Sequence, residues 1–186
     1  MPDADRLPFT PDERAQQLLA ANPVALLIGV VLYQQIPVEK AFAGPAVIAE
    51  RIGSDLDAST IAGMDPGALE EVFRERPAIH RFPANMAKRT QAVCEWLVSE
   101  HGGDPTALWR DVASASDVID RLTAVPGFGE YKARVYFGVL AKWFGVRPEG
   151  WEAAVPDWPT IADVDTLEDL ADLKIRKKAW KDAGGG

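Results

Sequence analysis

The sequence predicts an all-α fold, because apolar residues recur at helical spacing along most of the chain and no segment alternates apolar and polar residues as a strand does. The chain has 186 residues, the size of one domain that can bury a core. Its most distinctive segment, Val125-Pro126-Gly127-Phe128-Gly129, is a tight turn between two stretches of helical periodicity. We therefore expect one helical domain organised around this turn.

Start and stop signals place the helices in order along the chain. The first is expected at 11–19, with Thr10 as N-cap, Pro11 at the first helical position and Glu13 completing a capping box. The second begins after Asn22-Pro23 and is apolar nearly all round, as a helix at the centre of a bundle would be. Further helices are expected at 38–52, 66–73, 84–101, 109–115, 118–123, 131–144 and 166–173.

The charge is distributed unevenly along the chain. The formal net charge is −8, which opposes binding to a polyanion such as DNA. Residues 76–148, however, carry ten basic and seven acidic side chains, against five and twelve in 1–75 and five and nine in 149–186. The turn thus lies in the basic third, which favours local contact with DNA; an ordinary solvated surface is the alternative.

The cysteine count, the length of the apolar runs and the first residues argue against several classes of protein. Cys94 is the single cysteine, so the chain has no internal disulfide and no four-cysteine zinc or iron-sulphur site. No apolar run reaches the roughly 20 residues of a membrane span. The acidic start, residues 1–6, lacks the basic and apolar regions of a signal peptide. We therefore expect a cytoplasmic protein that does not bind membranes.

Two segments have chemistry that packing alone does not require. Gly127 and Gly129 allow the turn's amides to point outward, and the N-terminus of the next helix adds a partial positive charge, so the turn suits a phosphate. A plain turn between packed helices is the alternative. Tyr33-Gln34-Gln35 ends the apolar second helix abruptly. Its amides suit hydrogen bonding to a base, and a water-exposed helix end is the alternative.

These segments form part of a larger resemblance. The chain contains, in order, Tyr33-Gln34-Gln35, Met86-Ala87-Lys88-Arg89, His101-Gly102-Gly103-Asp104 and Leu122-Thr123-Ala124-Val125-Pro126-Gly127-Phe128-Gly129. This order and spacing resembles the HhH-GPD superfamily of base-excision DNA glycosylases, which includes endonuclease III, the adenine glycosylase MutY and 3-methyladenine DNA glycosylase II, and within it a short bacterial branch. The similarity covers residues 24–145, most of the chain.

The resemblance implies a helix-hairpin-helix glycosylase fold in one domain, 1–186. A six-helix barrel would span 22–145 with the hairpin at 118–135, while 1–21 and 146–186 would supply packing helices and a tail. Relatives with an iron-sulphur cluster end in a four-cysteine loop that this chain lacks. We therefore expect the fold without that cluster.

The resemblance also implies roles at the hairpin. The turn would hold the phosphate beside a flipped-out nucleotide, and the backbone carbonyls of Thr123, Val125 and Phe128 would hold a monovalent cation, K+ or Na+. A cation beside outward-pointing amides strengthens the hold on a phosphate. No other cofactor is expected.

Further residues match positions that contact DNA in relatives. Gln35 matches a glutamine inserted into the gap left by the extruded base, and pairing with the orphan base offsets part of the few kcal/mol of lost stacking. Lys88 matches a basic position, with a solvated lysine as the alternative. The rings of Tyr33, Tyr131 and Phe128 suit stacking on a base or, alternatively, packing in the core. The expected DNA contacts are Gln34, Gln35, Lys88, Val125, Gly127, Phe128, Gly129, Tyr131 and Lys132, with Tyr33 and Tyr131 in the base pocket.

Two departures from the family bear on the chemistry. Tyr131 stands where bifunctional relatives carry a nucleophilic lysine, and Lys132 follows about 100° further around the helix, so we expect it to point elsewhere and no lyase activity. The catalytic carboxylate is also displaced: position favours Glu149, whereas the motif Pro159-Thr160-Ile161-Ala162-Asp163-Val164-Asp165-Thr166 favours Asp165. We rank Asp165 first and Glu149 second; an N-cap for the last helix is the alternative role of Asp165.

The predicted function is that of a monofunctional DNA N-glycosylase, which hydrolyses the bond between a damaged or mismatched base and deoxyribose. We expect a monomer that acts on double-stranded DNA at the nucleoid. One alternative is a catalytically inactive protein that binds damaged or distorted DNA, and another is an acidic protein-interaction domain. The basic run 174–181 either braces a DNA backbone or is a solvated helix end.

Overall fold

The computed structural model describes residues 5–185, and this part of the chain is all-α, as predicted. It contains no strand within those residues, only one isolated bridge between Ser114 and Glu149. The helices are α1 (Glu13–Ala21), α2 (Pro23–Leu32), α3 (Val38–Ile52), α4 (Ala58–Gly63), α5 (Pro66–Arg74), α6 (Pro83–His101), α7 (Ala115–Thr123), α8 (Glu130–Trp143), α9 (Trp151–Ala154) and α10 (Glu168–Asp182), with 3-10 helices η1 (Pro105–Leu108) and η2 (Ile161–Asp163).

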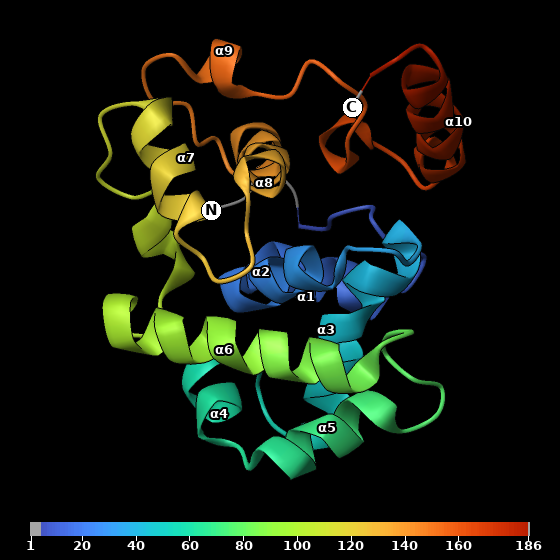
Figure 1. Cartoon of the computed structure of the whole chain (residues 1–186), viewed down its shortest axis with the longest axis vertical. Coiled ribbons are helices and arrows are strands. Elements are labelled where there is room, and N and C mark those ends of the chain that lie inside the picture. Colours follow the sequence, from blue (N-terminus) through green and yellow to red (C-terminus); the bar gives the residue numbers. More distant parts are fainter. Residues whose placement is uncertain (1–4, 186) are drawn as a thin grey trace.

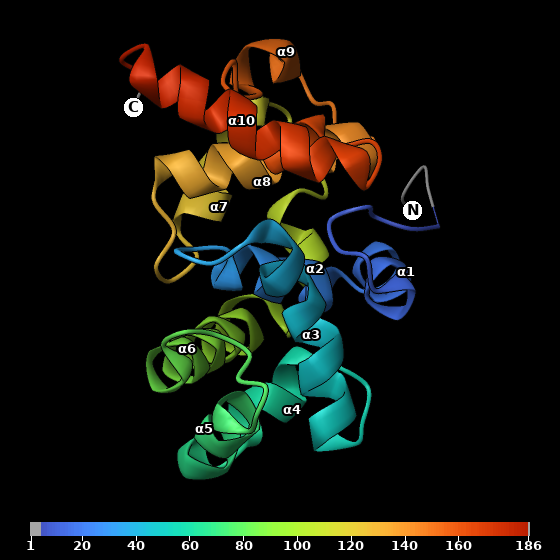
Figure 2. The ribbon, with the colours of Figure 1, turned by 90° about the vertical axis from the view of Figure 1, so that its right-hand side faces the viewer.

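The helices form three layers (Figures 1 and 2). In one outer layer α4 and α5 pack on α6, and α7 to α10 make up the other. The middle layer holds α1, α2 and α3, with α2 in contact with both α3 and α6. One continuous buried cluster runs through all three layers, from Leu7 to Leu173.

Helix α2 is the centre of this core. All of its residues from Val24 to Leu32 are buried, which agrees with its prediction as a central helix. The Asn22 side chain fixes its start, because its oxygen accepts hydrogen bonds from the amides of Val24 (2.9 Å) and Ala25 (3.1 Å). A Cβ on Gly29 would lie 2.7 Å from the Phe42 ring, so α2 and α3 pack closely at this point.

Several predicted boundaries were wrong. The N-cap of α1 is Asp12 rather than Thr10, since the Asp12 carboxylate accepts from the Ala15 amide at 3.1 Å. The helix predicted at 109–115 is absent from the described chain: η1 ends before it, and α7 begins after it at a capping box made by Ser114 and Asp117. The last helix runs to Asp182, well past the predicted end at residue 173.

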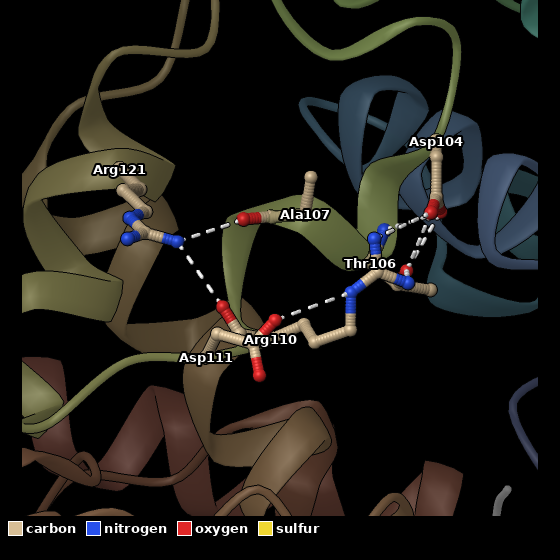
Figure 3. A network of polar contacts seen from close by, with 6 residues as sticks. All are labelled: Asp104, Thr106, Ala107, Arg110, Asp111 and Arg121. Atoms are coloured by element: carbon tan, nitrogen blue, oxygen red, sulfur yellow. Dashed lines mark hydrogen bonds and ion pairs between the residues drawn. The ribbon is translucent and has the colours of Figure 1, made fainter.

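A polar network fixes the position of α7 and therefore of the turn that follows it (Figure 3). The Arg121 guanidinium donates to the carbonyls of Ala107 (2.9 Å) and Arg110 (3.3 Å), tying α7 to the end of η1. Arg110 in turn donates to Thr106 (3.2 Å) and pairs with Asp104 (3.3 Å). Partial burial acts to raise the pKa of Asp104, but the hydrogen bonds from Thr106 and the Arg110 charge outweigh it and lower the pKa.

Over the described residues, no single helix is long and apolar enough to cross a membrane. Helices α1 and α2 would meet that criterion only as a pair, and they are bent by 116° at their junction.

Candidate nucleic-acid interface

The turn between α7 and α8 has an exposed backbone at its two glycines, whereas the side chains that flank them are buried in the core. Val125 and Phe128 are 1% and 9% exposed, and the Phe128 amide donates to the Val125 carbonyl at 2.9 Å. Gly127 has φ +80°, a conformation that other residues rarely adopt, and a Cβ on Gly127 or Gly129 would meet nothing within 4 Å. The backbone at both glycines is therefore open to a ligand, as predicted from the sequence.

The first turn of α8 is also open. Its N-cap is Gly129, and no side-chain hydrogen bond caps it in the described chain. Unpaired amides and the partial positive charge of a helix N-terminus favour an anion at this point. Glu130, in the same turn, carries the opposite preference, but its side chain lines a separate cavity that also contains Arg134 and Glu149.

The predicted cation site uses backbone atoms of the same turn. The Val125 carbonyl already accepts from the Phe128 amide, and the Thr123 hydroxyl donates to Ile119 O at 2.8 Å, back along α7. Across residues 5–185, no three His, Cys, Asp or Glu side chains form a group that could hold a metal ion. A cation held by the three carbonyls stays a prediction.

Phe128 packs in the core and does not line the cavity described below. Its ring makes an edge-on contact with the buried Tyr136 at 6.5 Å between centroids. The core alternative therefore holds for Phe128, whose aromatic ring anchors the turn.

Gln34 is held in place by the protein itself. Its amide nitrogen donates to Val31 O at 2.8 Å, and its amide oxygen accepts from Arg89 at 2.8 Å. His80 contacts the Gln34 carbonyl oxygen at 3.0 Å through Nε2, while its Nδ1 accepts from the Phe82 amide at 3.0 Å, which assigns the proton to Nε2. Burial lowers the pKa of His80, so the ring stays neutral near pH 7. Gln34 therefore acts as a clamp for the loop between α2 and α3.

Gln35 is the free amide of the pair. It is exposed, and its side chain makes no hydrogen bond to any other residue described. Its backbone has φ +56°, a conformation that costs an L-residue roughly 1–2 kcal/mol. Strain of this kind clusters at functional sites, so Gln35 is a candidate binding residue.

Phe82 is a candidate contact that the sequence reasoning missed. Its ring is 45% exposed, and the Arg81 guanidinium lies 4.8 Å from the ring centroid. Phe82 and Gln35 line one cavity of about 170 Å³, together with Arg89. The sequence signal for this contact is weak: a basic and an aromatic residue stand directly before Pro83, at the start of a helix.

A second cavity, of about 280 Å³, joins the loop after α2 to the start of α8. Figure 2 shows this loop beside the turn between α7 and α8. The cavity brings together most of the predicted polar and aromatic site residues and adds one from α10. Its lining consists of Val30, Tyr33, Gln34, Gln35, Ile36, Tyr131, Lys132, Val135 and Lys177. We call it the tyrosine–lysine cavity.

Lys132 lines this cavity together with Tyr131. The two side chains nevertheless diverge, because Lys132 Nζ lies over the Phe128 ring whereas the Tyr131 ring stacks on Trp158. Both residues lie in the first turn of α8, where a long side chain reaches the same opening despite the 100° rotation. Burial and, to a lesser degree, the Arg89 charge lower the pKa of Lys132 to about 8. This amine therefore loses its proton more readily than an ordinary lysine.

The two tyrosines differ in their surroundings. Tyr33 is partly buried, and its hydroxyl accepts a hydrogen bond from Lys177 Nζ at 2.7 Å. Burial, then the Glu39 charge, raises the pKa of Tyr33 to about 12, so the phenol is neutral. Tyr131 is 53% exposed and stacks on Trp158 with centroids 5.5 Å apart. Its ring is therefore held in a fixed orientation at the rim of the cavity.

Neither predicted catalytic carboxylate lines the tyrosine–lysine cavity. Asp165 pairs with Lys142 at 2.7 Å, and Lys142 lies ten residues beyond Lys132 on α8, about 15 Å along the helix axis. The N-cap alternative for Asp165 was wrong, because Asp169 accepts the amides of Asp165 (2.9 Å) and Thr166 (2.7 Å).

Glu149 has a backbone role instead. Its carbonyl accepts from the Ala115 amide at 2.9 Å, and its amide donates to Ala113 O at 3.3 Å. These bonds connect the segment after α8 to the start of α7. The exposed side chain lines the cavity that also contains Glu130 and Arg134.

Lys88 lines neither of these two cavities. It lines a groove of about 840 Å³ between α5 and α6, together with Glu70, Glu95 and Arg89. The solvated alternative therefore suits Lys88, whereas its neighbour Arg89 supplies the positive charge beside Gln34.

Comparisons of the chain with protein-family models, with curated proteins and with solved structures find no match. Geometry therefore defines the class: an all-helical protein with an open glycine turn beside an aromatic and cationic cavity.

Proposed function

We propose that this protein is a DNA N-glycosylase of the helix-hairpin-helix type, which binds duplex DNA at the turn between α7 and α8 and accepts an extruded nucleotide in the tyrosine–lysine cavity. The observation that supports this most is the cavity itself. Residues 33–35 and 131–132, far apart in the sequence, line it together at the open N-terminus of α8.

Charge supports the choice of DNA as partner despite the net charge of −8. Arg81, Arg89, Lys132 and Lys177 lie on or beside the two cavities next to the turn. No acidic residue lines either cavity in the part of the chain that the structure describes. A local cationic surface of this kind attracts phosphates even when the whole molecule is acidic.

Two side chains suit the extrusion step. The unclamped amide of Gln35 can take the place of the lost base, and the exposed Phe82 ring can enter the base stack beside it. An amide hydrogen-bonds to the orphan base, and an apolar ring recovers part of the stacking. Each interaction offsets part of the few kcal/mol that extrusion costs.

The location of Lys132 favours a second chemistry, in which an amine replaces the missing carboxylate. A neutral lysine amine is a nucleophile towards the sugar carbon C1′. Attack at C1′ breaks the bond to the base, the base leaves with the electron pair and is protonated, and loss of the amine proton with ring opening gives an imine. This second candidate function is a glycosylase with lyase activity carried by Lys132.

Duplexes that each carry one deaminated, oxidised or alkylated base test both candidates. Abasic product that appears only after alkali indicates hydrolysis alone, whereas strand cleavage without alkali and a borohydride-trapped protein–DNA adduct indicate the amine. Lys132→Met removes the adduct under the second candidate, and Asp165→Asn or Glu149→Gln leaves it unchanged. Lys178→Met, at an exposed position on α10, is the matched control.

The outcomes separate the alternatives. No product from any duplex, with salt-dependent binding retained, indicates an inactive protein that reads DNA structure. Loss of hydrolysis in Asp165→Asn would restore the carboxylate mechanism and would show that the ion pair with Lys142 opens on DNA. No binding even at low salt would leave the acidic protein-interaction domain.

A further inference from the structure

The polar lining of the tyrosine–lysine cavity is rich in cationic hydrogen-bond donors. It includes the two lysines Lys132 and Lys177 and, within residues 5–185, no acidic residue. Glu39, whose charge acts on Tyr33, lies off the lining and pairs with Lys174 at 3.0 Å. A ligand in this space therefore meets two positive groups that no acid on the lining balances.

Donor capacity remains on both lysines. Lys177 uses one N–H on the Tyr33 hydroxyl, 2.7 Å away, and an ammonium has three. Lys132 Nζ lies 5.2 Å from the Phe128 ring centroid and makes no hydrogen bond to another residue in the described chain. These N–H groups are therefore free to donate to acceptors on a ligand.

The cavity also has the size and the walls for a single aromatic ring. At about 280 Å³ it lies at the lower limit of small-molecule sites. The Tyr131 ring at its rim is fixed by Trp158, which stacks in turn on Trp180 of α10, with centroids 6.3 Å apart. Val30 and Val135 supply apolar wall.

We propose that this cavity selects bases that carry no positive charge and present several hydrogen-bond acceptors, such as deaminated or oxidised bases, and rejects cationic alkylated bases, with Lys177 of α10 as the specificity-determining residue. The proposal rests on the function proposed above and names its substrate class. Uracil and hypoxanthine offer carbonyl and ring-nitrogen acceptors to the two lysines. A base such as 7-methylguanine carries a positive charge that both ammonium groups repel.

Contacts on both sides of Lys177 hold helix α10 in place. Lys174 anchors it to α3 through Glu39, and Trp180 anchors it through Trp158. Lys177 lies between these two anchors, about one turn from each, and enters the cavity. Within the basic run 174–181, Lys177 therefore lines the cavity, whereas Lys178 is exposed to solvent.

Binding of uncleavable duplexes tests this selection without relying on catalysis. Four labelled duplexes carry one 2′-fluoroarabino nucleotide each, with uracil, hypoxanthine, 7-methylguanine or guanine as the base, and fluorescence anisotropy gives each affinity. We expect uracil and hypoxanthine to bind about tenfold more tightly than 7-methylguanine, the ratio of one charged hydrogen bond. Lys177→Met should reduce that ratio to about threefold or less, Lys177→Arg should keep it, and Lys178→Met should leave it unchanged.

Three results would overturn the proposal. Tighter binding of 7-methylguanine than of uracil and hypoxanthine contradicts the selection while leaving the glycosylase function standing. An equal loss of affinity for all four duplexes in Lys177→Met assigns the lysine to a backbone phosphate. Equal affinity of the native protein for all four duplexes removes the proposed function itself, and the selection with it.

Discussion

At the scale of single residues, the site is made by what surrounds each polar group. Gln34 and Gln35 are chemically identical neighbours, yet Arg89 and Val31 bind the side chain of the first and leave the second free. Lys132 and Lys178 are both lysines on helices, yet only Lys132 is desolvated. Side-chain environment therefore assigns the roles.

The lowered pKa of Lys132 predicts an unusual titration. Since the folded value, about 8, lies below the ordinary value near 10.4, the amine charges less readily in the native state. Folding is penalised while the group is protonated, and the penalty is relieved as pH rises from 8 towards 10.4. Arg89 is the charge that acts on this amine, so Arg89→Ala should raise its pKa.

A carbon-13 NMR titration of the lysine Cε signals checks this prediction. Assigned with Lys132→Met, the Lys132 signal should have its midpoint near 8. A Lys132 midpoint at the ordinary lysine value of about 10.4 would contradict the desolvated environment.

Gln35→Gly separates stability from binding at one position. Glycine removes the strain at φ +56° but increases the entropy of the unfolded chain, so we expect a net gain of up to about 1 kcal/mol in unfolding free energy. Urea unfolding measures this change. DNA affinity should fall, because the inserted amide is lost. Gln34→Ala should instead destabilise by about 1 kcal/mol, since it removes the clamp.

At the scale of elements, two junctions decide where the site lies. The network of Arg121 with η1 fixes the end of α7, and the His80 contact with the Gln34 carbonyl fixes the loop after α2. The cavity lies between the loop after α2 and the first turn of α8.

Gly127→Ala tests whether the turn meets DNA. At φ +80°, alanine should cost about 1 kcal/mol of stability, and a Cβ should also obstruct a phosphate at the exposed backbone. Gly53→Ala is the matched control, because Gly53 has φ +68° and lies at the end of α3 with open space around it. Both variants should lose similar stability in a thermal melt, and only Gly127→Ala should lose DNA affinity. An equal effect of both on binding would remove the turn from the interface.

At the scale of the whole molecule, charge limits the contact with DNA. The net charge is −8, so binding must rest on the local basic groups near the cavity. With Arg81 and Arg89 as candidates for phosphate contact, and Lys132 and Lys177 assigned to the base, the slope of log affinity against log salt should be about −2. Fluorescence anisotropy at salt concentrations between about 50 and 200 mM measures this slope. A slope near zero would exclude a phosphate-based interface. Separately, sedimentation of the complex tests whether the protein binds DNA as the predicted monomer.

Local sequence signals determined much of the helical framework. The predicted spans 38–52, 84–101 and 131–144 agree with α3, α6 and α8 to within one residue. Helix caps, prolines and glycines act over a few residues, so they can be recognised from the sequence alone. The same signals failed at 109–115, where the structure has no helix until α7 begins at Ala115. They also failed at the end of α10, whose basic C-terminal half is held by contacts with α3 and with Trp158.

The sequence by itself thus determined the all-α class, the central helix α2, the open glycine turn and the choice of Tyr33, Gln35 and Tyr131 as site candidates. Only the tertiary structure decided that Lys132 and Lys177 line the cavity and that Asp165 and Glu149 do not. The physical reason is distance in sequence: helix packing and a salt bridge fix where a long side chain ends, and residues 33 and 177 meet through the fold alone.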